Sequence, residues 1–490
     1  MIGLLNLQNP NYYNLYFIFP CFCLWLVILY TIREKNNVFL SQVIFFLKIC
    51  LKFSWISVVF LVILICYALY LPLSYDESFT FIQFVNRSTF YAACTYPAPN
   101  NHVLHSVLSN ILWHVFGWTN LALIVRIPSI LASCFLMNVF ITKISKTNVF
   151  YSGLFLILLL FNLPYLSFSF QARGYAMEIL FAVISSVIIF QSTQFKTFND
   201  KQYLILFFSL LGLYTSPAYL YTFLPLYTSF LLLNITDSLR SIKLIIKSAL
   251  FFGLTIVLLY APIIVFRGYE PIIHNRFVAP LDHLSFLDAL FHLINAFSEV
   301  LGGQIISVLI FSLTLYFSVV KRRFAIIPLF ALPLLLMLVL KQTPFTRVFL
   351  PLAIVLVVIA IADLRSTLKN KKQFKPMLVP IFIGISLVIS ALLFFEKPNG
   401  GIETSFSVKK LSKYFNHKNI YLEPKTHDYL KVPIEAYLQL SDIKYSKLDR
   451  STKLKEGSIL IFSEWSRKNI KILDSVPSLD KIVYVGKVEF

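Results

Sequence analysis

The first 395 residues consist largely of apolar runs, each roughly as long as the ~20 residues that a helix needs to cross a bilayer. Over the whole chain of 490 residues, 58% are apolar and 13% are charged, and the mean hydropathy is +0.76. Soluble domains average about 45–50% apolar and about 25% charged residues. The pattern therefore excludes a soluble globular protein and predicts an all-α polytopic membrane protein.

We predict twelve transmembrane helices. The first run is expected to be retained, because its first charge, Arg33, follows the apolar stretch, whereas a signal peptide carries its positive charge before it. The predicted spans are 14–32, 53–71, 121–142, 149–168, 175–193, 203–217, 218–234, 245–266, 300–320, 324–340, 348–362 and 376–395.

The distribution of Lys and Arg predicts how these helices thread the membrane. With the N-terminus outside, the cytoplasmic connections carry 19 Lys and Arg, and the opposite side carries 7 before the C-terminal region. Loops that stay in the cytoplasm are enriched in these residues, so this orientation is favoured over its mirror image. The net charge of +20 is explained by orientation, and no nucleic-acid partner is expected.

Composition divides the chain into two parts. Residues 1–395 are predicted to form a transmembrane domain whose outer loops are 72–120 and 267–299. In the first loop, residues 103–118 place apolar side chains at helical spacing, which predicts a helix lying in the membrane interface. Residues 396–490 are predicted to form a small soluble extracytoplasmic α/β domain, with strands at 419–422, 459–462 and 482–485 and a helix at 429–440.

Several chemical motifs are absent from the sequence. It contains no GxxxxGK[ST], GxGxxG, HExxH, CxxC or DxD. The chain therefore offers no recognisable nucleotide cradle, zinc site or nucleotide-sugar metal site, which disfavours an energised pump and a soluble-type sugar transferase.

Two adjacent carboxylates, Asp76 and Glu77, follow directly after the second predicted span. Charges near a membrane are costly and usually face a cavity or a partner. A carboxylate here could accept a proton from an acceptor hydroxyl or hold a metal ion. The alternative is that these acids stabilise the first turn of a following helix.

Four cations lie at separate helix ends on the predicted outer side: Arg126, Arg173, Lys341 and Arg347. Together they could bind a phosphate through charge-assisted hydrogen bonds. The alternative is that each one extends towards lipid headgroups. Asn101 and His102 end a polar, proline-containing turn before the interfacial helix, and local evidence alone favours turn chemistry with a solvated histidine for that segment.

These patches, taken in order, resemble the glycosyltransferase C superfamily. The likeness is to the branch that uses polyprenyl-phosphate sugars, which includes protein O-mannosyltransferases and the lipid A aminoarabinose transferase. It covers about residues 53–362. The matching patches are Tyr75-Asp76-Glu77, Pro99-Asn100-Asn101-His102-Val103-Leu104 with Phe116-Gly117, Arg126-Ile127-Pro128-Ser129, Ala172-Arg173-Gly174-Tyr175-Ala176 and Thr346-Arg347-Val348-Phe349-Leu350-Pro351.

The resemblance implies a membrane enzyme that transfers a sugar from a polyprenyl-phosphate carrier to a lipid, glycan or protein acceptor, usually with inversion, on the extracytoplasmic face. The catalytic carboxylate would be Asp76, with Glu77 beside it. The resemblance implies no certain cofactor, and a divalent ion, Mg²⁺ or Mn²⁺, beside Asp76 stays open. The donor phosphate would be bound by Arg173, Lys341, Arg347 and Arg126, and the pocket would be shaped by Tyr75, Asn101, His102 and Tyr175.

Two other functions stay open at this stage. A transporter or flippase of a lipid-linked glycan would need ionisable residues near the middle of the bilayer and broken helices in matched halves, whereas these charges gather at helix ends. The second of these functions is a non-catalytic scaffold whose C-terminal domain binds a partner. The low cysteine content, six in 490 residues, and the lack of a recognisable retention signal at the C-terminus favour a bacterial cytoplasmic membrane, with the site facing the periplasm or exterior.

Overall fold

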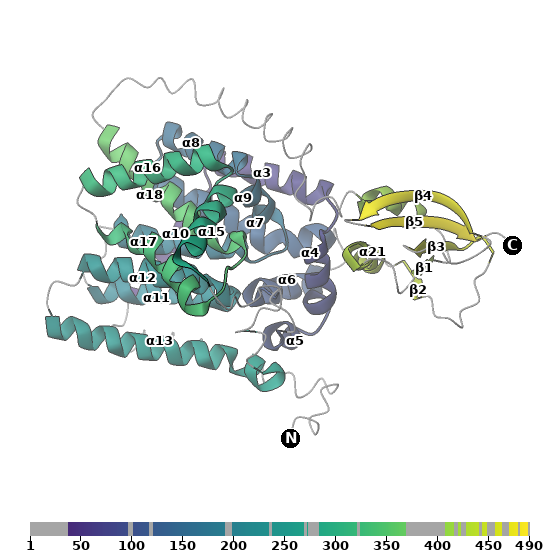
Figure 1. Ribbon diagram of the computed structural model, residues 1–490, viewed down its shortest axis with the longest axis horizontal. Helices are drawn as coiled ribbons and strands as arrows, with labels where there is room; N and C mark the ends of the chain where they lie inside the picture. The colour runs from purple at the N-terminus through teal and green to yellow at the C-terminus, as the bar shows by residue number, and fades with distance from the viewer. Residues whose placement is uncertain are drawn as a thin grey trace.

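A computed structural model describes residues 38–96, 101–116, 121–191, 198–234, 238–268, 272, 284–320 and 324–368, and, in the C-terminal region, 407–415, 420–422, 428–440, 443–447, 456–462, 470–478 and 481–488. A body made of helices extends to residue 368, and a small sheet lies at one end of it (Figure 1). The predicted spans 14–32 and 376–395 lie outside the described residues.

The helical body contains α-helices joined by short 3-10 and π segments. The α-helices are α2 Val38–Cys50, α3 Trp55–Tyr70, α4 Tyr75–Thr80, α5 Thr89–Cys94, α6 Val103–Phe116, α7 Leu121–Val139, α8 Val149–Phe161, α9 Leu163–Phe170, α10 Tyr175–Phe190, α11 Phe198–Thr215, α12 Leu220–Asn234, α13 Ser238–Arg267, α15 Phe286–Val300, α16 Gln304–Val320, α17 Pro328–Leu340 and α18 Leu350–Leu368. The short segments are η2 Phe81–Val85, η3 Phe140–Ser145, η4 Pro217–Tyr219, η5 Phe324–Ile326 and η6 Thr346–Phe349.

Three continuous helical segments are long and apolar enough to cross a membrane: Ala122–Ser145, Ile245–Ile264 and Thr346–Thr367. Two further pairs qualify if each bent pair is one span. Leu40–Cys50 and Trp55–Tyr70 meet at 72°, and Val149–Leu160 and Leu163–Phe170 meet at 88°. The described residues thus give three to five candidate spans, and the prediction of twelve is not confirmed. Several predicted spans correspond to shorter apolar helices such as α10 and α17.

Polar capping side chains determine where several of these helices begin. Ser54 Oγ accepts a hydrogen bond from the N–H of Ser57 at 3.2 Å at the start of α3. Asn162 lies at the bend between α8 and α9, and its side-chain oxygen accepts from the N–H of Tyr165 at 2.9 Å. Such caps satisfy N–H groups that have no partner within the helix, which is necessary where a helix breaks inside an apolar body.

The helical body exposes apolar side chains and buries polar ones. In α6, Ile111 and Val115 are exposed while Ser109 and Asn110 are fully buried, which is the reverse of a surface helix in a soluble protein. Long apolar side chains are also exposed on α3, α13 and α16. Exposed apolar surface on this scale indicates contact with lipid, so the molecule has the character of a membrane protein.

The helix α7 connects two opposite ends of the body. Near its start, Arg126 donates to the carbonyl of Leu71 at the end of α3. Near its other end, the Asn138 side chain accepts from Ser57 Oγ and donates to the Cys50 carbonyl, both near the start of α3. The two helices therefore run antiparallel, as expected for successive spans. Arg126 also contacts Glu77 of α4, and α4 packs against α21, so this end of α7 is the one that faces the C-terminal region.

The C-terminal region forms a five-stranded mixed sheet in the order β2-β1-β3-β5-β4. Its elements are η7 Ser412–Tyr414, β1 Ile420–Leu422, α21 Asp428–Leu440, β2 Tyr445–Lys447, β3 Ile459–Phe462, β4 Ile470–Ser478 and β5 Lys481–Val488. Strand β1 pairs in parallel with β2 and β3, and β5 pairs antiparallel with β3 and β4. Strands occur at the three predicted positions and a helix at the fourth, while β2 and β4 were not predicted.

Helix α21 packs against α4 of the helical body (Figure 1). Ala436 is fully buried there in a cluster with Leu73, Phe81 and Val85. At the margin of this contact, Lys409 Nζ donates to the Tyr70 carbonyl at 3.3 Å. The sheet domain therefore rests on the short helix that carries the predicted acidic pair.

Candidate functional site

Helix α4 turns its two carboxylates in different directions. Glu77 is 1% exposed, whereas the side chain of Asp76 is 34% exposed. Consecutive side chains of a helix point about 100° apart, so two adjacent acids face different surroundings. The pair predicted from sequence therefore separates into one buried and one accessible carboxylate.

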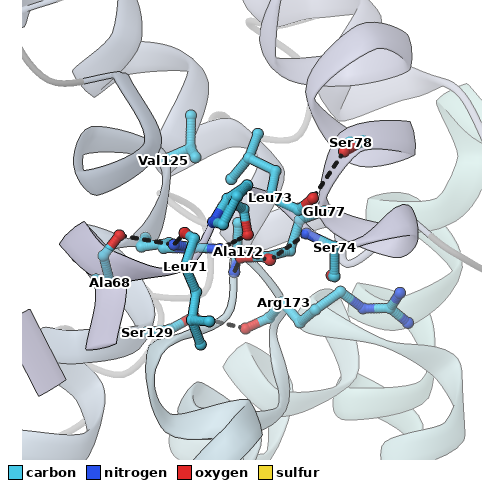
Figure 2. Close-up of polar contacts among 12 residues, drawn as sticks. Ala68, Leu71, Leu73, Ser74, Glu77, Ser78, Val125, Ser129, Ala172 and Arg173 are labelled. Carbon is cyan, nitrogen blue, oxygen red and sulfur yellow. Dashed lines mark hydrogen bonds and ion pairs between the residues drawn. The ribbon is translucent and has the colours of Figure 1, made fainter. Parts of the chain in front are cut away.

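Glu77 is the centre of a saturated buried network. It accepts from Arg126 Nε at 2.7 Å and Nη2 at 2.8 Å, from the N–H of Ser74 at 2.8 Å and from the N–H of Ala172 at 2.7 Å (Figure 2). Burial alone would raise the pKa of the Glu77 carboxyl, but the charge and hydrogen bonds of Arg126, with the two backbone N–H groups, hold that pKa below its ordinary value.

Arg126 is equally occupied. Besides Glu77, its guanidinium donates to the carbonyls of Ala68, Leu71 and Pro72 at 2.6–2.9 Å, and the side chain is 1% exposed. Neither Glu77 nor Arg126 has a free position for a ligand. This arrangement favours a positioning role for Glu77 and Arg126, while the catalytic and phosphate-binding roles expected from sequence stay predictions.

Asp76 instead lies between two other guanidinium groups. Its Oδ2 is 2.6 Å from Arg173 Nη1 and 3.6 Å from Arg347 Nη1. Arg173 is 1% exposed and Arg347 is 34% exposed. Burial would lower the pKa of Arg173, but Asp76 and the Tyr175 hydroxyl raise it, so Arg173 is held as a cation. The structure thus brings together three residues that were singled out from sequence, with Asp76 within ion-pair distance of both Arg173 and Arg347.

The buried network positions Arg173. The segment 171–174 joins α9 to α10, and the N–H of Ala172 is held by Glu77. Ser129 Oγ on α7 donates to the Arg173 carbonyl at 2.7 Å. Figure 2 shows the Arg173 side chain pointing away from Glu77. Glu77 thereby fixes the backbone from which Arg173 reaches Asp76.

An aromatic ring lies beneath both guanidinium groups. The Tyr175 ring centroid is 5.5 Å from Arg173 Cζ and 6.0 Å from Arg347 Cζ. On the same ring, His102 makes an edge contact with centroids 4.6 Å apart. Two of the predicted pocket residues therefore adjoin the charged cluster, and Tyr175 connects them.

The remaining predicted residues have other surroundings. Asn101 is buried and donates to the carbonyls of Ala92 and Thr95 while accepting from Ser106 Oγ, which is a structural role in the turn. Tyr75 begins α4 and is half-buried. Lys341 is exposed at the end of α17 with φ 51°, and among the described residues it makes no ion pair with Asp76.

The surroundings of Asp76 do not fit a divalent metal ion. Its nearest charged neighbours are two guanidinium groups, which repel a cation. In the part of the chain that the structure describes, no three His, Cys, Asp or Glu side chains are grouped as a metal site.

Glu178 on α10 is not among the site residues predicted from sequence. Its Oε1 lies 3.4 Å from His102 Nδ1, and both side chains are buried. The spacing of Glu178 from Tyr175, one helical turn, was the available signal that it lies on the same face of the helix.

Comparison of the chain with protein-family models, curated proteins and solved structures finds no match.

Proposed function

We propose that this protein is a membrane glycosyltransferase that moves a sugar from a polyprenyl-phosphate carrier to an acceptor on the extracytoplasmic face of a bacterial cytoplasmic membrane. The observation that carries the proposal is the placement of Asp76 between Arg173 and Arg347 at one end of an apolar helical body. Such a site offers a phosphate its cations and a polyprenyl chain its apolar surroundings.

The two arginines have different roles in this proposal. Arg173 is buried and close to Asp76, so it fixes the carboxylate. Arg347 is partly exposed and its 3.6 Å contact is loose, so it is free to rotate towards a donor phosphate. A guanidinium binds phosphate oxygens through two parallel hydrogen bonds, which suits Arg347 to that task.

In the proposed reaction, the bond between the anomeric carbon of the sugar and the phosphate oxygen breaks, and its electron pair goes to the phosphate. The acceptor oxygen forms the new bond to the same carbon, and the acceptor proton passes to Asp76. Negative charge grows on the phosphate as the sugar leaves, and Arg347 and Arg173 stabilise that charge more in the transition state than in the ground state. The reaction needs no metal ion in this form.

The test is sugar transfer in membranes that contain the full chain, with radiolabelled polyprenyl-phosphate sugars as donors. Asp76→Asn is expected to reduce the rate by about 100-fold or more, the usual contribution of a proton-transfer group. The matched control is Asp288→Asn, an exposed acid at the start of α15, which should leave the rate unchanged. Full activity of Asp76→Asn, or label that crosses the membrane without becoming attached to an acceptor, would contradict the proposal.

A further inference from the structure

A second polar cluster lies next to Tyr175, and several of its buried polar atoms make no hydrogen bond among the described residues. Among the described residues, no hydrogen bond is made by Glu178 Oε1, by either ring nitrogen of His102 or by the Tyr219 hydroxyl. Glu178, His102 and Tyr219 are 2%, 3% and 1% exposed. We call these three residues the Glu178 cluster.

Unpartnered buried polar atoms are expensive. Each costs about 1–3 kcal/mol, and native proteins keep few of them. The Glu178 cluster has four buried polar atoms without a hydrogen bond, on residues from α10, from the turn before α6 and from η4, and two of them, Glu178 Oε1 and His102 Nδ1, face each other at 3.4 Å. Segments far apart in the sequence thus place polar groups with unused hydrogen-bonding capacity near Tyr175, as the binding of a polar ligand requires.

The Glu178 cluster is continuous with the site at Asp76. The His102 ring contacts the Tyr175 ring, and Tyr175 contacts both Arg173 and Arg347. Tyr219 and buried Tyr96 lie close enough to Glu178 for a charge there to act on them. A ligand with an anionic group at Arg347 would therefore present its neighbouring chemical group to Glu178 and His102.

The chemistry of the cluster selects a neutral, hydroxylated group. Burial first, and then the charges of Arg173, His105 and Arg347, hold the pKa of His102 well below its ordinary value, so the neutral ring offers one donor and one acceptor. The Glu178 side chain and the Tyr219 hydroxyl add acceptors and a donor, and Tyr175 offers an aromatic face. Sugar hydroxyls match this mixture of donors and acceptors. A phosphate, which carries only acceptors and negative charge, does not.

We infer that Glu178, His102 and Tyr219 form the subsite for the sugar of the donor, adjacent to a phosphate position at Arg347. This inference rests on the proposed function, because it takes the donor to be a polyprenyl-phosphate sugar. It assigns specificity for the sugar to the buried Glu178 cluster and affinity for the carrier to the arginines.

Backbone packing keeps this cluster in register. A Cβ at Gly174 would clash first with Thr215 Cγ2 and would also lie 2.8 Å from His102 Cβ and Nδ1, closer than real Cβ contacts allow. Only glycine lets the start of α10 approach the His102 ring so closely. The position of His102 beside Glu178 thus depends on Gly174. The backbone dihedrals of Gly174 are ordinary, so glycine is needed there because it has no side chain.

The experiment compares two probes on purified full-length protein in nanodiscs: decaprenyl phosphate, and the same lipid carrying mannose, arabinose or aminoarabinose. The measured quantity is the ratio of the two dissociation constants, which reports what the sugar adds. Glu178→Gln and Tyr219→Phe are expected to reduce that ratio about tenfold for the best sugar, the effect of losing one hydrogen bond in a buried site, while binding of decaprenyl phosphate changes less than about twofold. Glu299→Gln on α15 is the matched control and should change neither value.

The outcomes separate the two hypotheses. Equal weakening of both probes by Glu178→Gln would overturn the sugar subsite, because the residue would then act on the carrier or on the fold. The subsite is also overturned if wild-type protein binds no sugar-bearing lipid more tightly than decaprenyl phosphate. Failure of the wild-type protein to bind either kind of lipid would instead overturn the proposed function. Tyr219→Phe removes one oxygen only, so it serves as the test should Glu178→Gln fail to fold.

Discussion

Replacing Glu77 by Gln is expected to destabilise the protein strongly although the change is nearly isosteric. Glu77 neutralises Arg126 in a place where both are 1% exposed. The amide of Gln has no charge, so the Arg126 cation would stay buried and unpaired. Breaking a buried ion pair by removing one partner costs about 3–5 kcal/mol.

The free-energy loss converts into a measurable temperature shift. Unfolding entropy is about 2.1 cal/mol/K per residue, which for 490 residues gives about 1 kcal/mol/K if the chain unfolds as one unit. The unfolding midpoint of Glu77→Gln should therefore fall by about 3–5 °C, and by more if a smaller unit unfolds. Tryptophan fluorescence of the purified protein, heated at a fixed rate, measures this midpoint.

Two further variants make the test specific. Asp288→Asn changes an exposed carboxylate and should shift the midpoint by about 1 °C or less. The double variant Glu77→Gln with Arg126→Met removes both charges, so it should be less destabilised than the sum of the two single changes. An unchanged midpoint for Glu77→Gln, or full additivity in the double variant, would refute the reasoning that these residues form a structural pair.

Three other outcomes follow from the structure. Gly174→Ala should cost about 1–3 kcal/mol through overpacking against His102, lowering both the unfolding midpoint and the rate of sugar transfer; a variant as stable and active as the wild type would contradict the close packing. The folded state holds the pKa of His102 well below 6.5, so below pH 6.5 the unfolded chain binds more protons than the folded protein, and the free energy of unfolding should decrease as the pH falls. His102→Asn should therefore flatten the dependence of the unfolding midpoint on pH between 6.5 and 5. If the midpoints of the variant and the wild type change with pH in the same way, a buried neutral ring is contradicted. Ala436→Glu should place a charge in the contact between α21 and α4, so hydrogen exchange of residues 75–80 should accelerate while the sheet stays protected; unchanged exchange would show that the contact does not stabilise α4.

The convergence of the charged residues was accessible from sequence, whereas their division into roles was not. Charges in an apolar chain must gather where they find partners, and this logic connected Asp76 with Arg173 and Arg347. It could not separate Asp76 from Glu77, since that depends on the direction in which α4 leaves the membrane domain. Ser74 with Glu77 three residues later was the usable signal, because this spacing is typical of a helix start in which the acid turns back to the backbone.

The number of spans was less accessible, and the reason is geometric. Hydropathy measures the composition of a segment but not its direction. The segment at 161–163 is apolar enough to continue a span, yet Asn162 ends one helix and caps the next at an angle of 88°. In the C-terminal domain, buried β3 was visible as an apolar run, whereas short β2 and polar-rich β4 carry no comparable signal.

The contact of α21 with α4 means that two equilibria share one element. Ala436 is buried among side chains that flank the Glu77 network. A shift of the sheet domain would therefore change the packing of α4, the helix that carries Asp76. Thermodynamic linkage is reciprocal. A molecule that binds the sheet domain more tightly when the domain is packed against α4 favours that packed arrangement by the same factor. A molecule that binds the sheet domain would therefore affect the Asp76 carboxylate through α4, which is six residues long.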